Sequence, residues 1–232
     1  MRVRVSISTV LGLTAALTLT ACSPSGTESR PADGSSARTD SPADNGRDSG
    51  AVLSSSELAS RLLGESDLGT GYTRKPDRPS GNDDITVLGC PELDDLGADA
   101  ATGSGGGLDF PHRAKAAFTY TASGEVTEEL YSDAAGKLSD GTGRIFDAMT
   151  GCPAYQVLAG RTPIDITTQE IPAPRIGDER WSHLLTFSSE GADMVVKQTA
   201  IRDGSVLLIV SGSPALVDRH LRAALTKATA TG

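Results

Sequence analysis

Three cysteines are the residues of this chain whose chemistry is most specific. A thiol can carry a lipid, pair with a second thiol or bind a metal, and its surroundings decide among these fates. Cys22 directly follows Leu-Thr-Ala at the end of an apolar run, whereas Cys90 and Cys152 each lie within the tripeptide Gly-Cys-Pro. The contexts differ so clearly that we expect Cys22 to have one role and the other two cysteines to share another.

The segment before Cys22 has the parts of an export signal. Arg2 and Arg4 give it a positive start, residues 10–19 are apolar, and a small residue precedes the cysteine. This order resembles the lipobox of bacterial lipoproteins, which implies that residues 1–21 are a signal peptide and that the Cys22 thiol receives diacylglycerol. Two acyl chains, at about 0.8 kcal/mol per buried methylene, would anchor the protein stably. An ordinary secretory signal and a retained membrane helix are the alternatives, and for a span of roughly 20 residues the apolar run is short.

Residues 22–51 are predicted to be a disordered tether anchored by that lipid. The run after Cys22 contains no aromatic residue and no Val, Leu, Ile or Met until the end of the tether. Such a composition cannot bury enough apolar surface to offset the entropy of ordering. The tether would span roughly 30 Å on average, which lifts the following domain away from the membrane surface.

Cys90 and Cys152 are predicted to form a disulfide once Cys22 carries the lipid. An exported protein with two remaining thiols most simply pairs them. The bridge would close a loop of about 63 residues and contribute about 4 kcal/mol on the chain-entropy model. Two free structural thiols, and a metal or redox role for the pair, are the alternatives.

The histidines and the short motifs of the chain do not favour catalysis or metal binding. His112, His183 and His220 are scattered, without Cys-x-x-Cys or His-x-x-x-His spacing, so we predict no metal and no cofactor. The sequence contains no Gly-x-Ser-x-Gly, Ser-x-x-Lys or His-Glu-x-x-His motif, so no catalytic residue is assigned. His220, on the last predicted helix, is expected to be exposed.

Trp181 and His183 are the candidate wall residues of a binding cleft. They alternate with Leu185 on one face of a predicted strand. Core packing for Trp181, and a packed or rim position for His183, are the alternatives to a place in a cleft wall. Asp178, which precedes this strand, is expected to be a turn residue.

Helices and loops that would position these residues follow from capping signals and periodicity. About 180 residues, from 52 to 232, suffice for one domain with a sizeable core. The first predicted helix begins at a Ser-x-x-Glu capping box, the second at Cys-Pro and the last at Ser-Pro. The third is indicated by a run with apolar residues three and four apart. They cover residues 54–62, 91–96, 133–149 and 214–228, whereas residues 76–89 and 97–107 are predicted to be loops.

Alternating side chains predict the strands. Residues 114–122 and 125–132 form one antiparallel hairpin, and residues 194–202 and 205–211 form another around Asp203-Gly204, for which a type I′ turn is expected. Further strands are predicted around residues 164–166 and 181–187. Residues 206–210 are apolar on both faces, which favours a central strand. The order of elements indicates an α+β domain whose mostly antiparallel sheet has flanking helices.

An acidic surface limits the partners of this domain. The precursor carries a formal charge of -9, and loss of the signal removes two further positive side chains. Such a balance argues against nucleic acid and against membrane binding through basic residues. The lipid on Cys22 would then be the attachment to the membrane.

These features together resemble actinobacterial surface lipoproteins with a sensor-like domain. They are the lipobox, the polar tether, a Gly-Cys-Pro before a small helix, a second cysteine after the middle helix, and Ile176-Gly177-Asp178 ahead of a strand with tryptophan. The domain is similar, over residues 54–230, to the extracellular part of PknH-type serine/threonine kinases. The resemblance implies a twisted antiparallel sheet with helices beside a cleft. The kinase domains carry two disulfides, whereas this chain can form one.

That resemblance implies a non-catalytic protein on the outer face of the cytoplasmic membrane. It would bind an unidentified small molecule, cell-wall component or protein. A scaffold or accessory subunit of a cell-envelope assembly is the alternative function, and an enzyme is the third.

Overall fold

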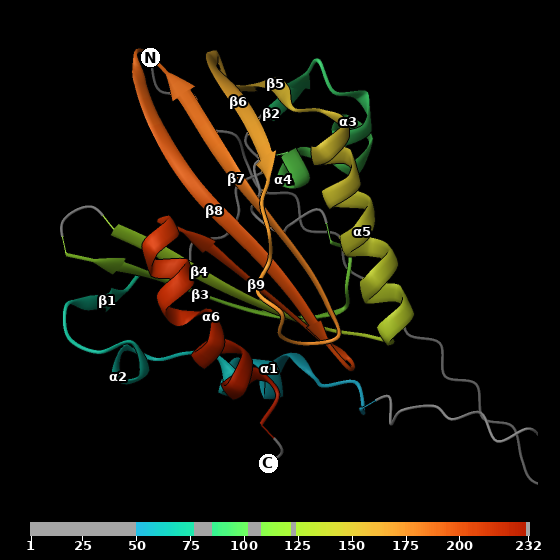
Figure 1. The fold of residues 1–232 in the computed structure, drawn as a ribbon, viewed down its shortest axis with the longest axis vertical. Coiled ribbons are helices and arrows are strands. Elements are labelled where there is room, and N and C mark those ends of the chain that lie inside the picture. The colour runs from blue at the N-terminus through green and yellow to red at the C-terminus, as the bar shows by residue number, and fades with distance from the viewer. Residues whose placement is uncertain (1–49, 77–84, 102–107, 122–123, 231–232) are drawn as a thin grey trace, which may run out of the picture. The chain divides into compact units, whose positions relative to one another are not determined.

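A nine-stranded antiparallel sheet is the frame of the protein (Figure 1). The structure is a computed structural model that describes residues 50–76, 85–101, 108–121 and 124–230. Across the sheet the strands follow the order β1-β3-β4-β9-β8-β7-β6-β5-β2. Their bounds are β1 Tyr72–Arg74, β2 Ile85–Leu88, β3 His112–Tyr120, β4 Gly124–Ser132, β5 Ala154–Ala159, β6 Thr162–Glu170, β7 Glu179–Ser189, β8 Ala192–Asp203 and β9 Val206–Gly212.

Helices cover both faces of this sheet, and long β7 and β8 rise together as its most extended hairpin (Figure 1). The helices are α1 Ser55–Arg61, α2 Glu65–Leu68, α3 Pro91–Leu96, α4 Ala98–Ala101, α5 Ala135–Gly151 and α6 Pro214–Ala228. The α+β class, the antiparallel sheet and the flanking helices are therefore confirmed. The predicted lipidation site Cys22, the signal peptide and the tether lie outside the described residues, apart from Gly50 and Ala51.

Strand β9 separates two apolar clusters on opposite faces of the sheet. Leu207 and Ile209 point into a cluster with α3, α4 and α5, whereas Leu208 and Val210 point into a cluster with α1 and α6. All residues from Val206 to Val210 are buried, and β9 pairs with β4 on one side and β8 on the other. The predicted central strand is confirmed, because only a strand covered on both faces needs apolar side chains at every position.

Local sequence signals define several element ends as predicted. Ser54 caps α1, and its backbone N–H donates to the Glu57 carboxylate at 2.8 Å, so the capping box is present. Pro91 begins α3. The hairpin of β3 and β4 pairs from His112↔Ser132 to Tyr120↔Gly124.

Four short elements were not predicted, and helix α2 is one of them. Strand β2 lies within the segment expected to be a loop, and α4 lies within the other expected loop. Strand β5 follows α5 almost directly and joins β2 to β6. Each of the four is only four to six residues long, too short for a periodic pattern to stand out. The two strands are held by their neighbours in the sheet.

The second hairpin is confirmed, but its turn lies one residue later than predicted. Asp203 and Val206 are paired, so Gly204 and Ser205 are the two central residues. Gly204 has φ 57°, and Ser205 is not among the positive-φ residues. A type I′ turn needs positive φ at both positions, so the expected type I′ turn is wrong, and positive φ at the first position alone is the type II′ pattern.

Candidate functional site

Trp181 and His183 lie on the wall of a cleft between α5, the start of β7 and the segment after β6. Both belong to the face of β7 that packs toward α5. The cleft has a volume of about 500 Å³, within the range of small-molecule sites. Its lining residues are Phe146, Asp147, Thr150, Glu170, Ile171, Pro172, Ala173, Arg180, Trp181, Ser182 and His183.

Aromatic rings form the apolar part of this cleft. The ring centroids of Phe146 and His183 are 4.8 Å apart at an interplanar angle of 34°. Phe146 also lies beside Trp181, with a centroid distance of 6.1 Å. Trp181 is partly exposed, whereas only 2% of His183 is. The imidazole is thus held in place, and the indole keeps surface available to a ligand.

The hydrogen bonds of Thr150 determine which nitrogen of His183 carries the proton. The Thr150 hydroxyl donates to the Phe146 carbonyl at 2.9 Å, so its one proton is used. Its oxygen lies 3.2 Å from His183 Nε2. While the hydroxyl donates to Phe146, this oxygen can only accept from the imidazole, which favours the tautomer with Nε2–H. Nδ1 is then the unprotonated nitrogen, a buried acceptor with no hydrogen-bond partner among the described residues.

Burial also keeps the imidazole neutral. Loss of hydration lowers the pKa of His183, and the nearby carboxylate of Glu170 only partly opposes this. Glu170 is the residue of β6 that pairs with His183 across the sheet. At neutral pH the ring therefore offers one donor, already bound by Thr150, and one acceptor.

Charged side chains line the cleft near its rim. Asp147 of α5 and Glu170 of β6 contribute carboxylates, and Arg180 of β7 contributes a guanidinium. All three are exposed. Among the described residues no ion pair joins any two of them, so their donors and acceptors are open to a ligand.

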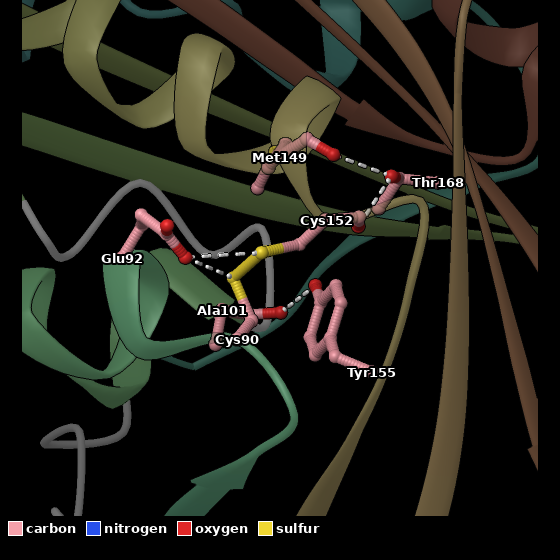
Figure 2. Close-up of a disulfide and its surroundings, with 7 residues drawn as sticks. All are labelled: Cys90, Glu92, Ala101, Met149, Cys152, Tyr155 and Thr168. Atoms are coloured by element: carbon pink, nitrogen blue, oxygen red, sulfur yellow. Dashed lines mark hydrogen bonds between the residues drawn. A yellow bond between two sulfur atoms is a disulfide. The ribbon is translucent and has the colours of Figure 1, made fainter.

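The disulfide predicted from the sequence joins Cys90 to Cys152 (Figure 2). The two Cα atoms are 5.8 Å apart, a normal distance for a bridge. It ties the residue before α3 to the residue after α5. Thr150 lies two residues before Cys152, so the bridge fixes the end of the helix that forms one wall of the cleft.

Hydrogen bonds around the bridge hold the same helix end (Figure 2). The Thr168 hydroxyl lies 2.7 Å from the Met149 carbonyl and 3.2 Å from the Cys152 carbonyl. The buried Tyr155 hydroxyl donates to the Ala101 carbonyl, and burial raises the pKa of Tyr155. The end of α5 is therefore bound to β6, and β5, which follows α5 almost directly, is bound to α4.

Cys90, Glu92 and Cys152 are the group with metal-ligand proximity in the part of the chain that the structure describes. Oε2 of Glu92 lies 3.5 Å from Sγ of Cys152 and 3.8 Å from Sγ of Cys90. Metals bind thiolates, and these sulfurs are joined to each other. Glu92 alone remains as a ligand, so the group does not suit a metal while the bridge is intact.

The other histidines lie apart from this cleft. Contrary to expectation, His220 is buried at 5% exposure. Its Nε2 lies 2.6 Å from the hydroxyl of Tyr72, which is 148 residues away in sequence. The prediction was wrong because β1 and α6 meet only in the folded protein. Asp178 is in the turn before β7, as expected.

Sequence reasoning named Trp181 and His183 but missed the residues around them. Phe146 and Thr150 are four residues apart on α5, and a shared helix face was the available signal. Glu170 and Arg180 lie at the ends of neighbouring strands, which only the pairing of β6 with β7 brings together.

A solved structure shares this fold. The extracellular domain of PknH from Mycobacterium tuberculosis superposes with a TM-score of 0.59 at 12% identity, over 77% of this chain and 97% of that domain. A putative uncharacterised protein from Mycobacterium smegmatis, an Rv0999 ortholog, gives a TM-score of 0.42 at 13% identity, over 75% of this chain and 97% of the other. No protein-family model matches the chain, and no curated protein matches it significantly.

The first of these similarities confirms the expected resemblance at the level of the fold. In addition, no helix among the described residues is long and apolar enough to cross a membrane.

Proposed function

We propose that this protein is a lipid-anchored, extracytoplasmic binding protein that holds a small ligand in the cleft beside Trp181. The single observation that carries the proposal is the combination of a cleft of about 500 Å³ with a rigidly held, neutral His183. Ligand sites are concave surfaces with apolar walls and a few fixed polar groups, and this cleft has both.

Binding without catalysis is the better account of the Thr150–His183 pair. A hydroxyl beside a histidine can form a nucleophile and its base. Here, however, the hydroxyl proton is directed to the Phe146 carbonyl, and the histidine nitrogen facing Thr150 is a donor. The imidazole cannot accept a proton from Thr150 in this arrangement, so the pair positions the ring rather than activating a nucleophile.

The anchor is supported by the order of charge, apolar run, small residue and Cys22. Metabolic labelling with a fatty-acid probe tests it. We expect the wild-type chain to take up label and the Cys22→Ser variant to lose it together with membrane association. Label that survives Cys22→Ser would contradict the anchor and leave the cleft proposal standing.

Ligand binding can be followed through Trp181, because it is the one tryptophan of the chain. The purified mature protein would be mixed with the glycan, peptide and lipid fractions of a bacterial envelope. We expect one fraction to change the indole fluorescence in a saturable way and to raise the melting temperature. If no fraction affects either signal, the binding proposal fails.

A scaffold role is the second candidate, and the open end of β8 favours it. Residues 192–196 of β8 extend beyond the part that pairs with β9, which begins at Lys197. Met194 and Val195 are 59% and 45% exposed there. An unpaired strand edge with apolar side chains can pair with another chain. One stoichiometric protein partner, recovered after crosslinking and lost in Met194→Lys, would favour this role.

A further inference from the structure

The chemistry of the cleft points to a class of ligand, and this step rests on the function proposed above. The cleft combines acceptors from three elements with an exposed aromatic surface. The acceptors are Nδ1 of His183 and the carboxylates of Asp147 and Glu170. A ligand that satisfies all of them must carry several O–H or N–H donors.

Nδ1 of His183 is the strongest of these constraints. An unpaired buried acceptor costs about 1–3 kcal/mol, and the ring has no freedom to turn away. Phe146 stacks against it, and Thr150 holds the opposite nitrogen. Nδ1 has essentially no accessible surface in the empty cleft. A ligand donor would therefore recover the hydrogen bond that the fold leaves unmade by displacing the side chains that cover this nitrogen.

Ligands rich in hydrogen-bond donors are either organic cations or neutral molecules with several hydroxyl groups, and Arg180 distinguishes between these two kinds. An organic cation would suit the carboxylates and the face of Trp181, but it would leave the donors of Arg180 in the same cleft without an acceptor. A neutral hydroxyl can donate to a carboxylate and accept from a guanidinium. Mixed donors and acceptors therefore favour neutral hydroxyl groups.

The aromatic wall supplies the remaining feature. Trp181 is partly exposed beside Phe146, whose ring centroid is 6.1 Å away. A flat apolar surface flanked by polar groups fits a ring that has apolar C–H faces and polar edges. We infer that the cleft binds a neutral carbohydrate, with a sugar ring on Trp181 and its hydroxyls on His183, Asp147, Glu170 and Arg180.

A chemical treatment of the envelope glycan fraction tests this inference. Periodate cleaves the carbon–carbon bond between neighbouring hydroxyl-bearing carbons, so it opens sugar rings that keep two adjacent free hydroxyls. The glycan fraction used is therefore the neutral polysaccharide in which most rings keep such a pair. The mature protein would be titrated with the glycan fraction, with the same fraction after periodate oxidation and removal of the reagent, and with tetramethylammonium and spermidine. We expect a saturable change of Trp181 fluorescence with the untreated fraction only.

Matched variants assign the binding to the cleft. His183→Phe keeps a ring against Phe146 but removes both nitrogens, whereas His183→Asn keeps an acceptor near the position of Nδ1. We expect His183→Phe to weaken binding about tenfold more than His183→Asn, the effect of one lost hydrogen bond to a buried group. If His183→Phe does not fold, Glu170→Gln serves instead, because Glu170 is exposed. Its control is Glu190→Gln, in the exposed turn after β7.

The outcomes separate this inference from the function on which it rests. Binding by the cations, by the lipid or peptide fraction, or by the oxidised glycan as well as the untreated one overturns the carbohydrate and leaves a binding protein. Glycan binding that Glu170→Gln and Glu190→Gln weaken equally overturns the cleft as its site. If no fraction changes the Trp181 fluorescence or the melting temperature, both the carbohydrate inference and the proposed binding function are overturned.

Discussion

Glu128 on β4 carries its carboxylate inside the protein, with 2% of the residue exposed. One oxygen accepts from the Leu63 backbone N–H at 2.8 Å, and Oε1 has no hydrogen-bond partner among the described residues. Burial raises the pKa of Glu128 from its usual 4.5 to about 7, and the Leu63 bond only partly offsets this. The folded protein therefore keeps a proton that the unfolded chain loses at lower pH. The stability from this proton is full below about pH 4.5 and is lost as the pH rises through about 7.

Replacing Glu128 with glutamine should remove this pH dependence, because an amide does not titrate. Between about pH 5 and about pH 8 the wild type should lose stability that Glu128→Gln keeps. The free energy of unfolding of the variant minus that of the wild type should therefore increase by roughly 2 kcal/mol over this range. Urea unfolding at both pH values measures it. Glu125→Gln, at an exposed position of the same strand, should follow the wild type. Parallel curves for Glu128→Gln and wild type would show that the carboxylate is not protonated in the fold.

Individual residues were predictable where their role depends on the strand or the helix that carries them. The alternation of Trp181, His183 and Leu185 in the sequence is enough to put all three on one face of β7. The tautomer of His183, however, depends on Thr150 of α5, and the burial of His220 depends on Tyr72 of β1. Such partners lie far away in sequence, so no local pattern contains them.

Among the elements, the segment that leads into β7 is tightly packed against its neighbours. Gly177 has φ 68°, and a Cβ at this position would lie 2.4 Å from Ile201 Cγ2 and 2.8 Å from the Arg202 carbonyl oxygen. Asp178 beside it accepts from the Gly204 backbone N–H at 3.0 Å and from the Arg202 guanidinium at 3.1 Å. The start of β7, and with it Trp181, is thereby held against the β8–β9 turn.

Gly177→Ala should accordingly cost more stability than positive φ alone explains. Gly160→Ala is the matched control, because Gly160 has φ 63° but a Cβ added there would meet no atom within 4 Å. We expect about 1 kcal/mol for Gly160→Ala and roughly 3 kcal/mol for Gly177→Ala, where steric overlap adds to the backbone cost. Chemical denaturation compares them, and equal losses would contradict the close packing of Gly177.

The bridge between α3 and α5 gives a second prediction for the elements. Replacing Cys90 and Cys152 together by alanine should lower the free energy of unfolding by about 2–4 kcal/mol. It should also weaken ligand binding, because the end of α5 carries Thr150 and Phe146. Alkylation of the denatured wild-type protein without reductant should leave both cysteines unmodified. Modification of both would contradict the disulfide.

Long elements were predicted better than short ones. The seventeen residues of α5 and the twelve of β8 repeat their pattern often enough to be recognised. Strand β2 has four residues and follows a polar stretch, so its pattern resembled that of a loop. The β8–β9 turn was misplaced by one residue because both Asp203-Gly204 and Gly204-Ser205 can form a two-residue turn.

For the whole molecule, β9 makes the two apolar clusters interdependent. Leu207 and Leu208 are adjacent, fully buried and directed into opposite clusters. We expect Leu207→Ala and Leu208→Ala each to cost about 2–5 kcal/mol, with unfolding still in one transition in both variants. Leu88→Ala, at a position 42% exposed on β2, should cost less than about 1 kcal/mol. Two separate transitions, seen by fluorescence and circular dichroism, would show that the clusters unfold independently.

The place of β9 also sets when the chain can fold. It lies between β4 and β8 in the sheet, yet along the chain it comes after the other eight described strands. A ribosome makes the other eight described strands first. None of them can complete either apolar cluster before residues 206–212 have been made. Until residues 206–212 have been made, the polypeptide therefore stays without its finished core. The export proposed above would require an extended chain, and this order of the strands would favour it.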